Sequence, residues 1–212
     1  MTQRFRYGLF FLIPVIVILD QWSKWLILNE PKFNALGCLG DRFECDKIEL
    51  SSVFDLTMVW NRGISFGFGQ SDGIMRWVLV LLTTGIAIGF GIWLFNALRK
   101  MTGTALALVV GGAIGNVIDR VRFGAVVDFF DFSGPWFGWK IPLGGVFKYL
   151  EYPFAHPTSR DGMLGIGFPY VFNVADAAIS VGAVLLFIDQ FLMSQKDNTA
   201  GAVTADEART PE

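Results

Sequence analysis

Four long apolar segments alternate with polar ones along the chain, and they predict four transmembrane helices. These helices are expected at about residues 8–28, 74–98, 104–128 and 170–190. Each segment is long enough to cross the ~30 Å hydrocarbon core of a bilayer as a helix. The second is the most uniform, because no charged residue occurs between Trp77 and Leu98. The pattern predicts an all-α membrane protein whose single integral domain covers residues 1–194.

The polar segment between the first two helices, residues 29–72, contains the pattern of a strand. Its hydrophobic residues recur at every second position from Phe54 to Trp60, which is the period of a half-buried β-strand. Glycines then punctuate the chain that follows. We therefore expect a small β-rich element outside the membrane between the first two helices.

The second long polar segment, residues 129–169, is too broken by proline to be a membrane span, yet it is rich in aromatic residues. Aromatic side chains gather at membrane interfaces and are scarce in disordered segments. We expect residues 133–168 to lie on the interface, and not to form a flexible linker, through Trp136, Phe137, Trp139, Phe147 and Tyr149. Residues 195–212 are small and polar, and they predict a disordered cytoplasmic tail.

Basic residues near the helix ends indicate the orientation of the chain, because they favour the cytoplasmic side of a membrane. Five of them fall on one side of the four-helix arrangement, namely Arg4, Arg6, Arg99, Lys100 and Lys196. Both termini are therefore expected in the cytoplasm, and both long loops outside it. Cys38 and Cys45 lie in the first of these loops. Since disulfides persist outside the cytoplasm, we expect these cysteines to form one.

The composition supports a membrane protein and narrows the possible chemistry. Hydrophobic residues make up 53% of the chain and charged residues 17%, against roughly 25% charged residues in soluble domains. The net charge of −2 gives no indication of a nucleic-acid partner. With one histidine and two cysteines, the chain offers no cluster of about four zinc ligands, so neither a metal nor another cofactor is expected. Catalysis would then rest on carboxylates, lysine or hydroxyl groups.

The third and fourth apolar segments carry polar side chains, which are costly to place in lipid and are functional by default. At 1.5 Å per residue along a helix, Asp128 and Asp176 fall at similar depth near the outer face, whereas Asp119 lies deeper. Two carboxylates at one depth could share a single proton, so that one activates water and the other protonates the leaving group. Alternatively, each aspartate only caps a helix at the interface.

Other polar residues flank this pair of aspartates. Asn116 and Arg120 are four residues apart and share one helix face, as do Asp20 and Lys24 in the first helix. These residues are candidates for the same site. On the alternative interpretation, Arg120 only neutralises the charge of Asp119, and Lys24 only reaches from Asp20 toward the headgroups.

Four motifs occur in one order along these segments: Asp20-Gln21-Trp22-Ser23-Lys24, Asn61-Arg62-Gly63-Ile64-Ser65-Phe66-Gly67, Gly115-Asn116…Asp119-Arg120…Gly124…Val127-Asp128-Phe129, and Phe172-Asn173-Val174-Ala175-Asp176. In these motifs, and over most of residues 8–190, the sequence resembles the bacterial lipoprotein signal peptidases (signal peptidase II). The resemblance implies an aspartyl endopeptidase of the bacterial inner membrane. Such an enzyme removes the signal peptide from prolipoproteins and cleaves just before a cysteine that carries diacylglycerol.

The resemblance also implies roles for individual residues. Asp128 and Asp176 match the catalytic pair, in agreement with the depth argument, and Asp119 matches a position with a structural role. Seven further residues match positions that shape the site and bind substrate or the peptide antibiotic globomycin: Asp20, Lys24, Asn61, Gly63, Asn116, Arg120 and Asn173. The implied partners are prolipoproteins, membrane lipid and globomycin-type inhibitors. Two features depart from the family, because the 129–169 loop is unusually long and the cysteine pair is particular to this chain.

Two other classes of protein also place ionisable residues inside a membrane. A small transporter or proton-coupled channel would spread its charges across the membrane depth and often contains a repeat between its halves. Here the charges concentrate toward the outer face, and the two halves show no repeat. A non-catalytic scaffold would use the polar residues only to hold helices together. Replacement of Asp128 separates the three interpretations, because a scaffold tolerates asparagine, a transporter loses flux and a peptidase loses cleavage.

Overall fold

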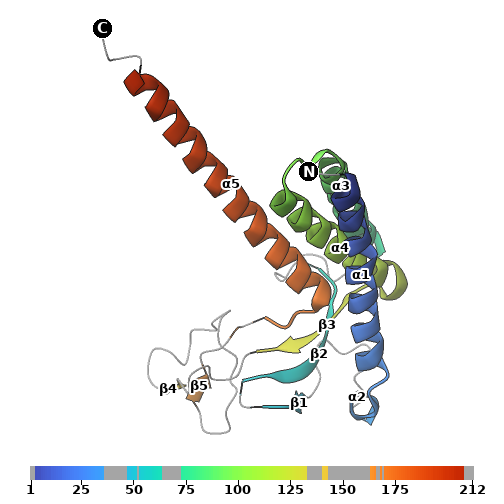
Figure 1. The fold of residues 1–212 in the computed structure, drawn as a ribbon. Helices are drawn as coiled ribbons and strands as arrows, with labels where there is room; N and C mark the ends of the chain where they lie inside the picture. Colours follow the sequence, from blue (N-terminus) through green and yellow to red (C-terminus); the bar gives the residue numbers. More distant parts are fainter. Residues whose placement is uncertain are drawn as a thin grey trace.

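The structure, a computed structural model, describes residues 3–35, 47–51, 53–63, 73–132, 140–142, 163–165, 168 and 170–207. Its elements follow the order α1 (Gln3–Leu28), α2 (Pro31–Ala35), β1 (Ile48–Glu49), β2 (Asp55–Asn61), α3 (Gly73–Asn96), α4 (Lys100–Phe123), β3 (Val126–Asp131), β4 (Lys140–Pro142), β5 (Met163–Gly165) and α5 (Val174–Glu207). Figure 1 shows the sheet of β1, β2 and β3 at one end of the long helices.

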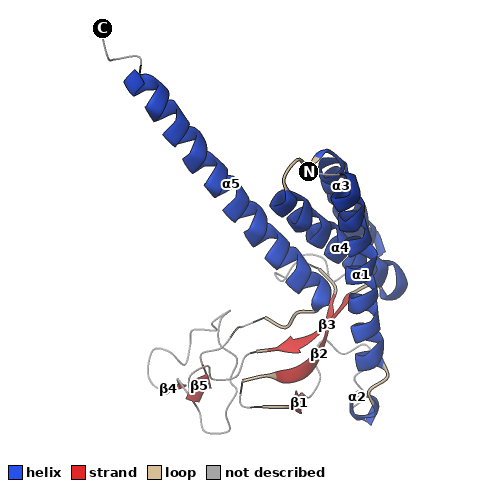
Figure 2. Ribbon diagram, in the orientation of Figure 1, coloured by secondary structure: helices blue, strands red, loops and turns tan. Residues whose placement is uncertain are grey.

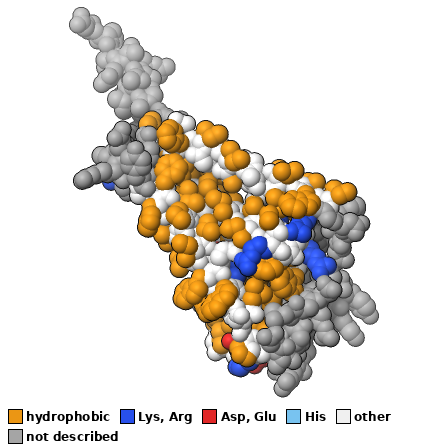
Figure 3. Space-filling model, turned by 90° about the vertical axis from the view of Figure 1, so that its right-hand side faces the viewer, with side chains coloured by type: hydrophobic (Ala, Val, Ile, Leu, Met, Phe, Trp, Pro, Cys, Tyr) orange, Lys and Arg blue, Asp and Glu red, His pale blue; other side chains and the backbone are white. Residues whose placement is uncertain are grey.

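Four helical segments are long and apolar enough to cross a membrane: Gly8–Leu28, Ile74–Asn96, Lys100–Phe123 and Val174–Ser194. They confirm the four predicted spans. In its most apolar stretch α4 is 67% buried, against 17% for each of the other three. The central helix is therefore α4, and its neighbours present largely hydrophobic side chains outward (Figure 3).

The close packing of α4 depends on small residues. A Cβ atom added at Gly112 would clash with the carbonyl oxygen of Ala175 in α5, and one at Gly111 would lie 2.9 Å from the Cβ of Ile16 in α1. Glycine at these positions lets the helix backbones approach closely, as is common between membrane helices. The backbone of α4 is therefore held close to both α1 and α5.

The strand predicted around residues 54–60 is confirmed as β2, the middle strand of an antiparallel sheet ordered β1-β2-β3 (Figure 2). The sheet packs on the end of α1 and on α2 through a buried hydrophobic cluster of Ile27, Phe33, Met58, Val127 and Phe129. Since helices and sheet share this cluster, the sheet holds a fixed position beside the ends of the membrane helices.

The third helix ends earlier than the sequence predicts. It was expected to continue to residue 128, but α4 ends at Phe123 and Asp128 lies on β3. Gly124 adopts the left-handed conformation, with φ of 79°, and its N–H donates to the carbonyl oxygen of Arg120, which is a common way to end a helix. The β-branched and aromatic residues that follow favour a strand, and β3 pairs with β2 so that Val126 lies opposite Asn61.

The fourth helix also differs from its predicted range, 170–190. The helix α5 begins at Val174, after a single antiparallel bridge between Phe130 and Phe172 ties its approach to β3. It continues through Glu207, beyond the predicted end at residue 190 and into the segment for which disorder is predicted. No proline interrupts this polar stretch, and alanine, lysine and glutamate in it favour the helix.

Two predictions fall on residues outside the described ranges. Cys38 and Cys45 lie in 36–46, so their expected disulfide stays a prediction. The five aromatic residues of the 133–168 loop also lie outside these ranges. Within that loop the described parts are Phe168 and the small antiparallel pair of β4 and β5, in which Lys140 lies opposite Gly165.

Candidate active site

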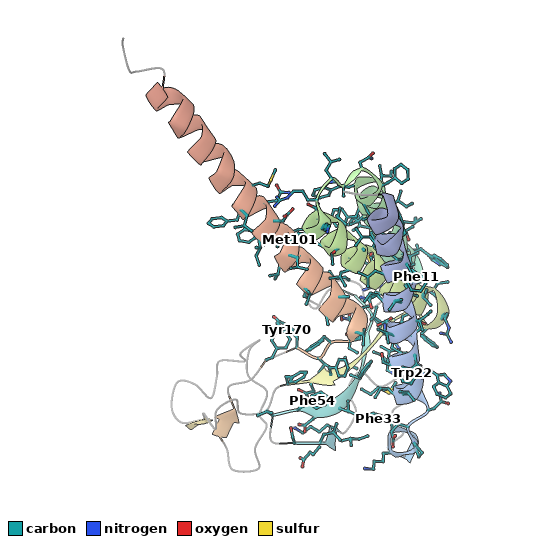
Figure 4. All side chains as sticks on the ribbon, in the orientation of Figure 1. Phe11, Trp22, Phe33, Phe54, Met101 and Tyr170 are labelled. Carbon is teal, nitrogen blue, oxygen red and sulfur yellow. The ribbon has the colours of Figure 1, made fainter. Side chains whose placement is uncertain are left out.

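Apart from Arg120, the polar residues predicted to form one site lie in one connected hydrogen-bond network. The network occupies the place where α1, the last turns of α4, the strands β2 and β3, and the first turn of α5 meet (Figures 1 and 4). Its members come from four separate stretches of the chain, and no two of those stretches are adjacent in sequence.

Asp128 is one of the two aspartates at the centre of this network. Its side chain points inward from β3, and the residue is only 2% exposed. Its Oδ1 accepts a hydrogen bond from Nδ2 of Asn173 at 2.7 Å, and its Oδ2 accepts one from Nδ2 of Asn61 at 3.1 Å. Asn61 is oriented in turn by the N–H of Gly63, which donates to its Oδ1 at 3.2 Å. At φ of 144°, residue 63 has a backbone conformation that strongly favours glycine.

Asp176, the second aspartate, lies in the first turn of α5 and is half-buried. Its Oδ1 accepts a hydrogen bond from Nδ2 of Asn116 at 2.7 Å. Its backbone N–H donates to Oδ1 of Asn173 at 2.9 Å, so Asn173 acts as the N-cap of α5. Because the amide nitrogen of Asn173 also binds Asp128, one side chain links the two aspartates.

The orientation of Asn116 follows from its neighbours. Its Oδ1 accepts hydrogen bonds from Nζ of Lys24 at 3.3 Å and from Nδ2 of Asn173 at 3.2 Å. With two donors facing its oxygen, the amide group must direct its own hydrogens toward Asp176. Asn116 therefore supplies a fixed donor to the second aspartate.

Lys24 lies beneath this layer and is 2% exposed, between Asp20 and Asp119, which are fully buried. Its Nζ lies 2.8 Å from Oδ2 of Asp20 and 2.7 Å from Oδ2 of Asp119. Asp20 accepts a hydrogen bond from the N–H of Ala175 in α5, and Asp119 accepts one from the N–H of Val127 in β3. This ion-paired triad thus anchors the backbone beside each of the two central aspartates.

Gln21 is a member of the network that sequence reasoning did not single out. Its Nε2 donates to Oδ1 of Asp119 at 2.8 Å and to Oδ2 of Asp20 at 3.2 Å. Its position between Asp20 and Lys24 in the first motif was the only available signal. A helix position next to Asp20 gives no indication that its side chain reaches α4.

Arg120 is half-buried near the centre of the site. Its charge is close enough to interact with Asp176, Asp128 and Asp119. Within the described part of the chain, its buried Nε has no hydrogen-bond partner. A buried guanidinium N–H without an acceptor is unusual in a folded protein, and it is a feature that a bound ligand could satisfy.

The environment of Asp128 changes its acidity. Burial, and after it repulsion by the nearby carboxylate of Asp176, raises the pKa of this carboxyl group from 3.8 to about 7. Hydrogen bonds from Asn61 and Asn173, and the charge of Lys24, act in the opposite direction. Near neutral pH Asp128 is therefore poised between its protonated and ionised forms. Among the described residues, no group of three or more His, Cys, Asp and Glu side chains is placed to hold a metal ion.

The chain is similar to known proteins over almost its whole length. The family described as "Signal peptidase (SPase) II" matches residues 12–192. The lipoprotein signal peptidase of Methylobacterium radiotolerans is 35% identical over 96% of both chains. That of Caulobacter vibrioides is 36% identical over 85% of this chain and 84% of the relative. That of Shewanella amazonensis is 32% identical over 90% of this chain and 91% of the relative.

Solved structures support the fold. Two of them, both titled as a bacterial membrane enzyme, have a TM-score of 0.58 with this chain, at 23% and 22% identity. The first match covers 90% of each chain, and the second covers 86% of this chain and 92% of the other. From the family match and the curated relatives, this multi-pass membrane protein belongs to the signal peptidase II family, whose members are aspartic-type lipoprotein signal peptidases.

Proposed function

We propose that this enzyme removes the signal peptide from diacylglyceryl-modified prolipoproteins by cleaving before the lipidated cysteine, and that Asp128 and Asp176 are its catalytic pair. The observation that carries the proposal is the linked placement of the two aspartates. The side-chain amide of Asn173 donates to the carboxylate of Asp128 and accepts from the backbone N–H of Asp176, and the buried Asp128 has a pKa of about 7. A protonated and an ionised carboxyl group side by side are what acid–base hydrolysis of a peptide bond requires.

The unequal burial of the two aspartates assigns their roles. Asp128, at 2% exposure, is the group on which a proton resides more readily. Asp176 is half-buried and is held by a hydrogen bond from Asn116, so it is the carboxyl group that a water molecule reaches more easily. Asp176 therefore takes a proton from water as the water oxygen attacks the scissile carbonyl carbon, and Asp128 gives its proton to the carbonyl oxygen. When the tetrahedral intermediate collapses, Asp176 returns a proton to the departing amine and Asp128 recovers its own.

The surrounding residues act as positioning groups for these two carboxyls. Asn61 and Asn173 hold Asp128, and Asn116 holds Asp176. The triad of Asp20, Lys24 and Asp119 fixes the backbone that carries them. A displacement of about 1 Å can cost a large factor in rate. These amides and the ion-paired triad therefore affect the rate by holding the two carboxyl groups in place, although they take no part in the chemistry.

Arg120 binds the substrate and is not an acid or base, because a guanidinium stays protonated at any working pH. Its Nε is buried without an acceptor in the described part of the chain. A carbonyl oxygen of the substrate peptide, or of globomycin bound in the same place, would supply that acceptor. Gly63 supports this region by orienting Asn61 through its N–H.

The same proposal includes an orientation in the bacterial inner membrane, with both termini cytoplasmic and the site near the outer face. The site lies at the end of the bundle that carries the sheet, whereas Arg99 and Lys100 lie at the opposite end, where the chain from α3 enters α4. Basic residues favour the cytoplasmic end. The outer location gives the aspartates both water and lateral access to a lipidated cysteine.

The proposal is tested with purified enzyme and a diacylglyceryl prolipoprotein. We expect cleavage at the bond preceding the lipidated cysteine, inhibition by globomycin, and no cleavage of the same precursor without its lipid. Cleavage at another bond, or equal cleavage of the unlipidated precursor, would show that the substrate is wrongly assigned.

A further inference from the structure

Two arginines contact the last turn of α4 at the end that borders the sheet, outside the hydrogen bonds of the two aspartates. Arg76, near the start of α3, donates from Nη2 to the carbonyl oxygen of Val121, and its Nη1 would lie 3.7 Å from a Cβ atom at Gly124. Arg122, in the last turn of α4, donates from Nη1 to Oε1 of Gln21 at 3.2 Å. The two guanidiniums therefore flank the last turn of α4, where α1, α3 and α4 meet.

The charges of these arginines are not neutralised by the described carboxylates. Neither Arg76 nor Arg122 forms an ion pair with a carboxylate in the described ranges. Asp20 and Asp119 pair with Lys24, Asp55 pairs with Lys47, and Asp189 pairs with Arg99. The acid in the turn before Arg122 is Asp119, which is fully buried and already bound by Lys24 and Gln21. Both positive charges thus lie at the sheet end of α4 without a described carboxylate to pair with.

Aromatic side chains surround the two arginines. The guanidinium of Arg76 lies 5.1 Å from the centre of the Trp77 ring, and that of Arg122 lies 4.7 Å from the Phe123 ring. Trp77 is 49% exposed and Trp22, on α1, is 57% exposed. Figure 4 shows Trp22 extending outward from α1, and Figure 3 shows Lys and Arg side chains among hydrophobic ones on one face of the molecule.

The depth of these residues matches the headgroup layer. The candidate spans begin at Ile74 in α3 and end at Phe123 in α4, so Arg76 and Arg122 lie in the terminal turns of two spans. Exposed tryptophan together with arginine at the ends of spans is typical of the membrane–water interface. A guanidinium presents paired donors that match the oxygens of a phosphate.

We propose that Arg76 and Arg122 form a binding site for the phosphate of an anionic phospholipid, whose acyl chains lie along the exposed apolar faces of the adjoining helices. The charge of the site selects an anionic lipid over a zwitterionic one, because a choline group would be repelled by the two guanidiniums. The bound lipid bridges α3 and α4 at the turn that leads into β3, and so supports the backbone that carries Asp128.

The test measures lipid preference directly and does not depend on peptidase activity. Purified enzyme is mixed with equal amounts of phosphatidylglycerol and phosphatidylcholine, and the retained lipids are counted by native mass spectrometry. We expect a preference for phosphatidylglycerol that falls about fivefold in Arg122→Gln and further in the Arg76→Gln/Arg122→Gln double variant, since each basic residue near a membrane contributes modestly to anionic-lipid binding. Arg122→Lys, which keeps the charge, retains most of the preference.

The matched control is Lys32→Gln, which makes the same change of charge at an exposed position on α2. It should leave the lipid preference unchanged. An unchanged preference in the double variant, or an equal loss in Lys32→Gln, would overturn the proposal. So would displacement of phosphatidylglycerol by an equal concentration of inorganic phosphate, because the site would then recognise phosphate and not a lipid.

Discussion

Two buried polar clusters join α4 to α5, one at each end of their contact, and they differ in charge balance. The cluster beside the sheet holds four acids, Asp20, Asp119, Asp128 and Asp176, against two bases, Lys24 and Arg120. At the other end, Asp189 faces one base: Arg99 Nη2 lies 3.0 Å from its Oδ1, and Thr102 donates to its Oδ2.

This difference in charge balance distinguishes a cluster suited to catalysis from one that only joins helices. Because buried charges must be paired or neutralised, the surplus of acid beside the sheet can be accommodated only if a carboxyl group holds a proton. The raised pKa of Asp128 meets that requirement. The balanced pair of Arg99 and Asp189 has no such surplus, so we infer that it only holds the two helices together.

The largest effect is expected from asparagine at either central aspartate. Asp128→Asn and Asp176→Asn keep the side-chain shape, but the first removes the proton donor and the second the proton acceptor, and each should lower kcat about 10²–10⁴-fold. The double variant should be little worse than either single one, because the two residues act as a unit. Steady-state cleavage of a lipidated precursor measures this.

Asp131→Asn is the matched control for these variants. Asp131 is also buried on β3, but it lies an odd number of positions from Asp128 and so faces the other side of the sheet, where it accepts a hydrogen bond from Thr57 at 2.7 Å. It should stay active. Loss of cleavage in Asp131→Asn with near-normal cleavage in Asp128→Asn would mean that the first aspartate is wrongly assigned.

The next effect concerns stability. Lys24→Met removes the only described ion-pair partner of Asp20 and Asp119, which are fully buried. Breaking a buried ion pair in this way should lower the free energy of unfolding by about 3–5 kcal/mol, measured by denaturation in detergent micelles. The exposed Lys32→Met is its control. Equal midpoints for the two variants would show that the triad does not support the site.

A smaller effect is expected at Arg120. Arg120→Ala should weaken globomycin binding about tenfold or more, because a hydrogen bond to a charged group is worth about 1.5–3 kcal/mol. Arg120→Lys keeps the charge but not the planar group and should fall between the wild type and alanine. Calorimetric titration provides the affinities, and an unchanged affinity in Arg120→Ala would remove the proposed role.

The smallest effect on catalysis is expected at the other cluster. Asp189→Asn retains the hydrogen bond to Thr102. Because Arg99 is 39% exposed, water can replace the carboxylate that its guanidinium loses. Cleavage should stay within about twofold of wild type, while stability falls by about 1 kcal/mol, as for a partly exposed ion pair. Loss of cleavage as complete as that of Asp128→Asn would erase the distinction between the two clusters.

The same contrast shows what a sequence can predict. The four spans and the strand at 55–61 follow from apolar length and period. The end of the third helix does not, because the apolar residues after Phe123 suit a helix and a strand equally, and only Gly124 marks the change. The depth estimated from the sequence therefore places Asp128 near Asp176, but on a helix, whereas Asp128 lies on the strand β3.

Contacts between distant segments of the chain could not be predicted from the sequence. The link from Gln21 to Asp119, and the pairing of Thr102 and Arg99 with Asp189, join helices whose relative rotation no single-helix pattern defines. Arg99 was interpreted only as a basic flank. The extension of α5 beyond residue 195 was missed because polar composition was interpreted as disorder, although no proline ends the helix there.

The most direct test of the proton-sharing pair is an infrared titration of the resting enzyme between pH 5 and 9. The carboxyl pKa of about 7 at Asp128 predicts a protonated carboxylic acid band that is present at acidic pH and fades as the pH rises through neutrality. Cleavage should decline over the same range as the acid is lost. The band should be absent in Asp128→Asn and unchanged in Asp189→Asn. A band that persists in Asp128→Asn, or a spectrum with no carboxyl titration near pH 7, would contradict the account.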